Sequence, residues 1–257
     1  MCQFSRLLVL QLILYFAIGH IYGSTEIIGG NAVTQKIYPY YVRLHYRGEF
    51  ICGGSLVRNN AVLTAAHCVK DHSVKELSVH TDTINLGDPG VVRTIKTALV
   101  PNEYNAGTLN YDVAVLILSS VIPSASVIPL DKSAVPVGTR CLVIGHGKIE
   151  EYGVFSTQLQ EIHVHVTSRE VCKRKYRDFD GITESMMCAS EPGKKDSCSG
   201  DSGDPMICNG KQAGIVSWSL GCGRVKYPTV YTDISKVYSF IERALKMYAQ
   251  EVEQKYM

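Results

Sequence analysis

The chain has 257 residues, of which 46% are apolar and 19% charged, and its 26 Lys and Arg residues nearly balance 24 Asp and Glu residues. This apolar content excludes a disordered chain, and a formal net charge of +2 excludes the strongly basic surface of a nucleic-acid-binding protein. The sequence therefore describes a folded protein with little net charge.

The longest apolar run lies close to the N-terminus, at residues 7–18 (LLVLQLILYFAI). It follows one positive charge and precedes small residues, which is typical of a secretory signal peptide. A membrane anchor is the alternative, but a membrane span needs about 20 apolar residues, and this run is shorter and contains Gln11. We expect residues 1–23 to be a signal peptide, the mature chain to be secreted, and no membrane contact after signal removal.

Cysteine usage agrees with an extracellular protein. One of the nine cysteines lies in the expected signal peptide, which leaves an even number for disulfide bonds. No pair has the Cys-x-x-Cys spacing of a zinc site, so we expect four disulfides rather than metal ligation. The counts alone leave the pairing open. The remaining cysteines are Cys52, Cys68, Cys141, Cys172, Cys188, Cys198, Cys208 and Cys222.

Short runs of alternating or β-branched residues, separated by Gly, Pro, Asn and Asp, follow the signal along the chain. This spacing is typical of an all-β barrel or sandwich. Residues 121–136 contain prolines and have no clear periodicity, so we expect them to link two β units. The expected strands include residues 41–46, 61–64, 113–118, 141–144, 161–166 and 212–218.

The C-terminal region is the part of the sequence with a clear helical pattern. Its apolar residues recur at three- and four-residue steps from Ile234 to Tyr248, with charged residues between them. This period predicts an amphipathic helix at about residues 234–249, whose apolar stripe packs on the rest of the protein. Residues 250–257 are mostly polar, and we expect them to fray.

Three segments carry residue types that can perform chemistry: residues 63–68 (LTAAHC), 110–116 (NYDVAVL) and 196–205 (DSCSGDSGDP). A single histidine, or an aspartate before a strand, usually has a structural role. Together, however, the three segments supply the histidine, aspartate and serine that nucleophilic catalysis by a hydroxyl requires.

Further motifs extend this pattern over most of the chain. They are Ile-Ile-Gly-Gly at residues 27–30, Ser217-Trp218, and Pro-Thr-Val-Tyr-Thr at residues 228–232. With the three polar segments, they resemble the chymotrypsin/trypsin family of serine proteases from Ile27 to about Leu245. The resemblance implies an all-β fold of two six-stranded antiparallel β-barrels with the active site between them, plus a C-terminal α-helix.

The resemblance also implies the organisation of the chain and its disulfides. Residues 24–26 would be a short propeptide and residues 27–257 a serine protease domain. We expect the first barrel at about 27–125 and the second at about 126–233, followed by the helix. The implied disulfide pairs are Cys52–Cys68, Cys141–Cys208, Cys172–Cys188 and Cys198–Cys222.

By the same resemblance, the catalytic residues are His67, Asp112 and Ser202. A serine hydroxyl is a weak nucleophile at neutral pH, so His67 is expected to accept its proton and later donate it to the leaving amine. Asp112 would fix the imidazole tautomer and stabilise the imidazolium without taking the proton. The backbone N–H groups of Gly200 and Ser202 would form the oxyanion hole, which stabilises negative charge on the scissile carbonyl oxygen.

Members of that family are zymogens until cleavage frees an amino terminus that folds inward. The implied pair here is the α-amino group of Ile27 with Asp201, and a buried carboxylate without such a partner is costly. Glu26 precedes the cleavage point, where the family usually has Lys or Arg. We therefore expect a tryptic activator not to recognise this junction, and activation to need a Glu-directed protease or amino-terminal trimming.

Asp196 stands where trypsin-like members place an acid at the floor of the primary specificity pocket, which selects Lys or Arg side chains. The pocket walls depart from that pattern, because Ser219 and Thr229 stand where glycines let a long side chain pass. A closed pocket would leave Asp196 buried and unpaired, so we favour a narrowed pocket for Lys or Arg. A preference for small residues and a catalytically silent site are the alternatives. Substrate backbone is expected to pair as a strand along Ser217, Trp218 and Ser219.

Two further features concern the nucleophile and metals. Asp204 follows Gly-Asp-Ser-Gly, where the family usually has glycine, and puts a charge two residues from the nucleophile.

His163 and His165 share one strand face, which is better explained as a solvated face than as a metal site. Residues 78–93, where family members can bind calcium through glutamates, contain no glutamate. We expect no metal and no cofactor.

The sequence thus predicts a secreted serine endopeptidase that hydrolyses peptide bonds after Lys or Arg through an acyl-enzyme on Ser202. Expected partners are protein or peptide substrates and protein protease inhibitors, and the protein is expected to be a monomer that binds no nucleic acid. The alternatives are a protease with altered specificity, a regulatory protease with a single macromolecular substrate, and a non-catalytic homologue that binds proteins through the same crevice.

Overall fold

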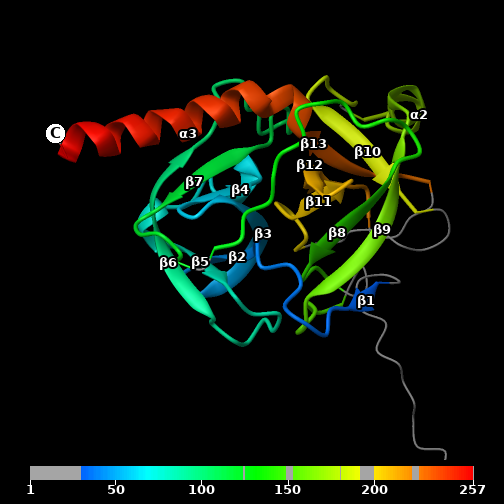
Figure 1. The fold of residues 1–257 in the computed structure, drawn as a ribbon. Helices are drawn as coiled ribbons and strands as arrows, with labels where there is room; N and C mark the ends of the chain where they lie inside the picture. The colour runs from blue at the N-terminus through cyan, green and yellow to red at the C-terminus, as the bar shows by residue number, and fades with distance from the viewer. Residues whose placement is uncertain are drawn as a thin grey trace, which may run out of the picture.

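The computed structural model describes residues 30–123, 125–148, 153–179, 181–191, 200–221 and 226–256, with side chains as far as Met247. Strands dominate this part of the chain and form two β-barrels that lie side by side (Figure 1). One long helix, α3 (Ile234–Tyr256), runs across the first barrel and carries the C-terminus (Figure 1).

The first barrel closes through antiparallel strands in the order β2-β3-β4-β7-β6-β5. Strands β4 and β7 are buried along their whole length, whereas β5 alternates buried and partly exposed residues. That alternation is the pattern of a strand with one face on a core. The six strands are β2 (Tyr41–Tyr46), β3 (Glu49–Arg58), β4 (Ala61–Thr64), β5 (Leu77–Thr81), β6 (Val91–Leu99) and β7 (Ala114–Leu118).

The second barrel closes through β8-β9-β10-β13-β12-β11, because β8 also pairs with β9. The short strand β1 (Asn31–Ala32) adds to the other edge of β9. The two predicted six-stranded barrels are therefore confirmed. The strands of this barrel are β8 (Arg140–Gly145), β9 (Gln160–Thr167), β10 (Met186–Ser190), β11 (Pro205–Cys208), β12 (Lys211–Trp218) and β13 (Thr229–Asp233).

Helix α3 begins directly after the last strand of the second barrel and packs on the first. Ile234, Val237 and Ile241 on its apolar stripe are fully buried in the same core cluster as the first-barrel strands. The predicted helix is thus present, and its backbone continues to Tyr256, past the expected end at residue 249 and through residues expected to fray.

A second helix, α2 (Arg169–Lys175), was not predicted. It has only seven residues, too few for an apolar period to stand out. Its start is nevertheless marked in the sequence, since the Ser168 side chain accepts a hydrogen bond from the backbone N–H of Val171 and caps the helix. Glu170 in its first turn and the basic residues in its last turn complement the helix dipole.

Three disulfides are formed in the structure: Cys52–Cys68 in the first barrel, and Cys141–Cys208 and Cys172–Cys188 in the second. Cys198 and Cys222, which were expected to form a fourth, lie outside the described residues. Among the helices of the described chain, none combines the length and the apolar character that a membrane crossing requires.

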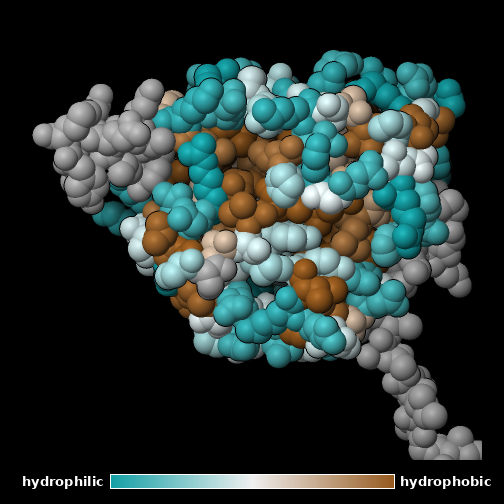
Figure 2. Space-filling view, in the orientation of Figure 1, coloured by the Kyte–Doolittle hydropathy of each residue, from teal (hydrophilic) through white to brown (hydrophobic). Residues whose placement is uncertain are grey.

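Apolar residues gather across the centre of one face, below α3 and where the barrels meet, and polar residues surround them (Figure 2). The chain that joins β7 to β8 contributes exposed Val121, Val127 and Val137 to the surface. The connection between the barrels therefore exposes some apolar side chains, although its Ile122 and Ile128 are buried.

Candidate active site

His67 lies in a short 3₁₀ turn, η1 (Ala66–Cys68), just after the buried strand β4. Its neighbours Ala65, Ala66 and Cys68 are buried, whereas the His67 side chain is 27% exposed. The fold thus fixes the backbone of this histidine in the core of the first barrel and leaves its imidazole accessible.

Asp112 precedes strand β7 and is fully buried. Oδ1 accepts the backbone N–H of His67 at 2.9 Å, and Oδ2 lies 2.7 Å from Nδ1 of the same histidine. Oδ2 also accepts the hydroxyl of Ser217 at 2.6 Å. A buried carboxylate with these partners is satisfied, and it requires the imidazole proton on Nδ1, which leaves Nε2 as the basic nitrogen.

The second barrel holds the backbone around Asp112 as well as its carboxylate. The Thr232 hydroxyl donates to the carbonyl oxygen of Asp112 at 2.7 Å, and the backbone N–H of Tyr111 donates to Oγ of Ser185 at 2.9 Å. Tyr111 has a φ of 54°, in the left-handed region. Ser185 and Thr232 were not predicted as site residues, because they are ordinary strand and loop residues far from Asp112 in the sequence.

Ser202, the expected nucleophile, lies in residues 200–204 immediately before β11, a segment called the nucleophile loop below for that expectation. Its carbonyl oxygen accepts the backbone N–H of Gly53 on β3 at 2.9 Å, and the N–H of Gly203 donates to Val216 on β12 at 2.9 Å. The loop is therefore tied to both barrels, and the Ser202 side chain stays partly exposed.

The nucleophile loop also contains Gly200, an expected oxyanion-hole residue, and Asp201, the expected partner of the activated amino terminus. Gly200 has a φ of +99°, which an L side chain rarely adopts, and a side chain there would also collide with the ring of Phe155. Asp201 is fully buried, and its Oδ1 accepts the backbone N–H of Gly147 at 2.7 Å.

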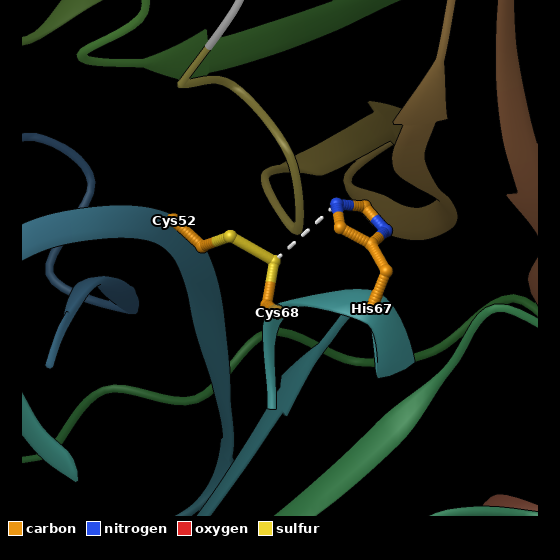
Figure 3. Close-up of side chains that lie close together, drawn as sticks. All are labelled: Cys52, His67 and Cys68. Carbon is orange, nitrogen blue, oxygen red and sulfur yellow. Dashed lines mark hydrogen bonds between the residues drawn. A yellow bond between two sulfur atoms is a disulfide. The ribbon is translucent and has the colours of Figure 1, made fainter. Parts of the chain in front are cut away.

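The basic nitrogen of His67 is not hydrogen-bonded to Ser202 in the described structure. Nε2 lies 3.7 Å from Sγ of Cys68 instead (Figure 3). Cys52, His67 and Cys68 are close enough together for their side chains to suggest a metal site. The two sulfur atoms are bonded to each other, however, so neither is a thiolate that could bind a metal (Figure 3).

The described residues that are expected to line the specificity pocket lie at the end of β12, just after it, and at the start of β13. The Ser219 hydroxyl donates to the carbonyl oxygen of Gly221 at 2.6 Å, and Thr229 is 1% exposed. Trp218 packs edge-on against Tyr176, with ring centroids 4.8 Å apart. Asp196, the expected pocket floor, and Ile27, the expected activated terminus, lie outside the described residues.

Comparison with known proteins agrees with this arrangement. The sequence profile of the Trypsin family matches residues 27–241. The chain belongs to the trypsin family of serine proteases. Its relatives include seminase from Drosophila melanogaster, 36% identical over 229 residues that cover 87% of this chain and 83% of that protein.

Other trypsin-family relatives come from vertebrates. Serine protease 1 of Rattus norvegicus is 36% identical over 243 residues, which cover 93% of this chain and 97% of the rat protein. Trypsin I-P1 of Gallus gallus is 37% identical over 228 residues, which cover 86% of this chain and 89% of the chicken protein. These matches extend over both barrels.

Proposed function

We propose that the protein is a secreted serine endopeptidase whose nucleophile is Ser202. The observation that carries the proposal is the hydrogen-bonded pair of Asp112 and His67, in which Nδ1 and Oδ2 are 2.7 Å apart. With its proton held on Nδ1, the imidazole offers Nε2 as the base that takes the Ser202 proton. The Ser202 oxygen then attacks the scissile carbonyl carbon, and His67 returns the proton to the leaving amine.

The oxyanion hole is assigned to the backbone N–H groups of Gly200 and Ser202. Losing one donor of this kind costs on the order of 3 kcal/mol of transition-state stabilisation. The positive φ of Gly200 supports the assignment, because it allows the backbone to turn its N–H toward a substrate.

We assign cleavage after Lys or Arg to Asp196 at the floor of a narrowed pocket. Ser219 supports this proposal, because its hydroxyl bonds the Gly221 carbonyl oxygen and is thereby directed along its own chain segment. Thr229 is the residue that narrows the proposed pocket for a Lys or Arg side chain, because its β-branched side chain stands where a glycine would leave more room. A preference for small residues is the alternative specificity.

Activation is proposed to occur by pairing of the Ile27 α-amino group with Asp201, after cleavage of the Glu26–Ile27 bond. The complete burial of Asp201 supports this role, because a buried carboxylate favours a cationic partner. Residues 1–23 as a signal peptide and 24–26 as a propeptide complete the proposed precursor. The mature enzyme is proposed to act as a monomer on protein or peptide substrates and to bind protein protease inhibitors.

The test uses protein refolded to begin at Ile27 and incubated with a mixed peptide library, with cleavage sites read by mass spectrometry. We expect cuts after Lys or Arg, loss of these cuts in Ser202→Ala, and loss of the basic preference in Asp196→Asn. Thr229→Gly should raise kcat/KM for Lys and Arg substrates by widening the pocket. Failure of a serine-directed covalent inhibitor to label Ser202, together with no cleavage, would indicate a binding protein instead.

A further inference from the structure

The nucleophile loop holds two aspartates whose carboxyl groups are fully buried, Asp201 and Asp204. Asp204 is the residue that the sequence places where related proteases usually have glycine. Its backbone N–H donates to the Asp201 carbonyl oxygen at 3.0 Å, and its own carbonyl oxygen accepts the N–H of Val216 at 2.9 Å. The two aspartates therefore belong to one tight turn that carries Ser202 between them.

Two glycines show how closely the carboxyl groups adjoin each other and the first barrel. A methyl group on Gly145, at the end of β8, would collide with oxygens of both Asp201 and Asp204. A methyl group on Gly53, on β3, would collide with the other oxygen of Asp204 and lie 3.2 Å from the hydroxyl of Tyr41. Asp204 thus fills the junction between the barrels, with Asp201 beside it.

The hydrogen bonds available at this junction do not suit two ionised carboxylates. Asp201 accepts the N–H of Gly147, but no donor among the described residues is in hydrogen-bonding geometry with either oxygen of Asp204. The Tyr41 hydroxyl lies beside Asp204 without meeting that geometry. An ionised Asp204 would leave a buried charge unsatisfied next to a second negative charge, which is strongly unfavourable.

One proton on Asp204 would remove one of the two adjacent negative charges and would also supply the missing hydrogen-bond donor. It converts an acceptor oxygen into a donor, and the adjacent Asp201 carboxylate is there to accept. Burial and the neighbouring Asp201 carboxylate raise the pKa of Asp204 well above its ordinary value of 3.8. Burial and the adjacent negative charge therefore both favour the protonated form of Asp204.

The other ionisable groups around the pair do not replace this proton. The Ile27 α-amino group, proposed above to pair with Asp201 in the activated protein, would be a partner of Asp201 and not of Asp204. Burial raises the pKa of Tyr41 well above 10, so it stays neutral, and burial lowers the pKa of His146 to about 4, so it is neutral as well. Arg43, on the same strand as Tyr41, is a cation, but its guanidinium donates to the carbonyl oxygens of Asn85, Leu86 and Asp88.

We propose that Asp204 is a positioning residue: its carboxyl group carries a proton, donates it in a hydrogen bond to the Asp201 carboxylate, and so holds the nucleophile loop against the first barrel. The inference rests on the proposed function, because the loop it fixes carries the proposed nucleophile. As pH rises and the shared proton is lost, two carboxylates face each other in a buried space, the loop loosens, and activity falls.

The direct test is infrared spectroscopy of the folded protein at neutral pH, performed on Ser202→Ala so that the outcome does not depend on catalysis. We expect the carbonyl band of a protonated carboxylic acid, and its loss in the Asp204→Asn form. The matched control is Asp233→Asn, because the Asp233 carboxylate already accepts the N–H and the hydroxyl of Ser235 at 3.0 and 2.7 Å. Absence of the band in the parent protein, or its persistence in Asp204→Asn, overturns the proposal.

A second test follows stability, also without catalysis. Above about pH 5 the unfolded chain has lost the Asp204 proton, whereas the raised pKa of the folded protein favours keeping it. While the folded chain keeps this proton, the equilibrium constant for unfolding rises by about tenfold per pH unit, so stability falls as pH rises. Asp204→Asn keeps a donor for Asp201 at every pH and should lack this dependence. A stability difference between the two proteins that does not change with pH contradicts the proposal.

The positioning role is read from kcat/KM against pH in the active protein. We expect Asp204→Asn to retain activity within about threefold at neutral pH and to extend it to higher pH, because an amide donates without titrating. Asp204→Ala, which cannot donate, should lose about tenfold at neutral pH. Equal activity of the Ala and Asn variants at every pH would show that Asp204 only fills space, and would overturn the positioning role while leaving Ser202 as nucleophile.

Discussion

At the scale of single residues, His146 shows how burial removes a charge. It is fully buried, with its ring centroid 5.8 Å from that of Tyr41 and 6.1 Å from that of Phe50. Its Nδ1 is 3.0 Å from the carbonyl oxygen of Ser156, which can only accept, so Nδ1 carries the proton. Its Nε2 has no hydrogen-bond partner among the described residues. The neutral ring is therefore the form that this space accommodates.

The low pKa of His146 predicts a loss of stability in acid. The unfolded histidine takes up its proton near pH 6.5, whereas the folded one does so only at about 4, so the folded state loses stability as pH falls through this interval. The full loss is about 3 kcal/mol in the free energy of unfolding. Urea denaturation at the two ends of the interval should show that His146→Phe lacks this loss.

A surface histidine provides the control for that experiment. The His165 side chain is 42% exposed and pairs with Glu191, so His165→Gln should keep the acid loss of the parent protein. The proposed proton on Asp204 makes stability fall as pH rises, which is the opposite dependence. Each variant is therefore compared with the parent protein at the same pH. Equal acid loss in the parent and in His146→Phe would refute the assignment.

At the scale of elements, strand β2 supplies the cation that organises the loop between β5 and β6. Arg43 is 1% exposed, and its Nη1 donates to the carbonyl oxygens of Asn85 and Leu86 at 2.8 and 2.6 Å. Its Nη2 donates to the carbonyl oxygen of Asp88. A planar guanidinium can make several such bonds at once, so one side chain fixes the loop from inside the barrel.

Replacement of Arg43 therefore tests this element. Arg43→Met leaves three carbonyl oxygens without their donor and should lower the free energy of unfolding by at least about 3 kcal/mol. Arg43→Lys should recover part of the loss, because an ammonium donates but lacks the planar fork. Because the loop is held by a side chain, a calcium chelator should leave Tm unchanged in the parent protein.

The control for Arg43 is an exposed arginine at the start of a strand. Arg140 begins β8 on the surface, so Arg140→Met should change stability by no more than about 0.5 kcal/mol. Chemical denaturation measures all four proteins. Equal stability of Arg43→Met and Arg140→Met would show that the guanidinium bonds contribute nothing net.

Elements differ in how far the sequence predicts them. The long helix α3 and the strands β7 and β9 have clear apolar patterns, whereas α2 is too short for its period to be recognised. From the sequence, Arg43 would be predicted to be an exposed polar residue that alternates with apolar residues along a strand. Its burial depends instead on a loop that starts some forty residues later. Asp204 is similar, because Tyr41, Gly53 and Gly145 enclose it from three distant parts of the chain.

At the scale of the whole molecule, the candidate site exists only where the barrels meet. The first barrel supplies His67 and Asp112, and the second supplies the Ser217 hydroxyl that bonds the same carboxylate. The segments carrying the histidine, aspartate and serine could be found from sequence because each is a short local motif. The contacts that align them, such as the buried bond from Ser55 to Gln212 at 2.6 Å, cross between barrels and leave no local pattern.

Helix α3 adds a second connection across this junction. It starts from the second barrel and buries Ile241 completely in the core of the first. Further along the helix, the Leu245 carbonyl oxygen accepts a hydrogen bond from Nη1 of Arg58 at 3.0 Å. Because the helix is continuous with β13, loosening it weakens one of the connections between the barrels. The orientation of the two halves therefore depends in part on a helix that lies outside the candidate site.

Truncation of Ile241 tests that dependence. Ile241→Ala should lower the free energy of unfolding by about 3 kcal/mol, because it removes buried methyl groups and leaves a cavity. Met247→Ala, at a position 58% exposed on the same helix, should cost far less. Peptidase activity and tryptophan fluorescence, followed together on heating, should be lost in one transition at a lower Tm in Ile241→Ala, since the barrels hold the site jointly. Activity lost well below the fluorescence transition would mean instead that the barrels separate before they unfold.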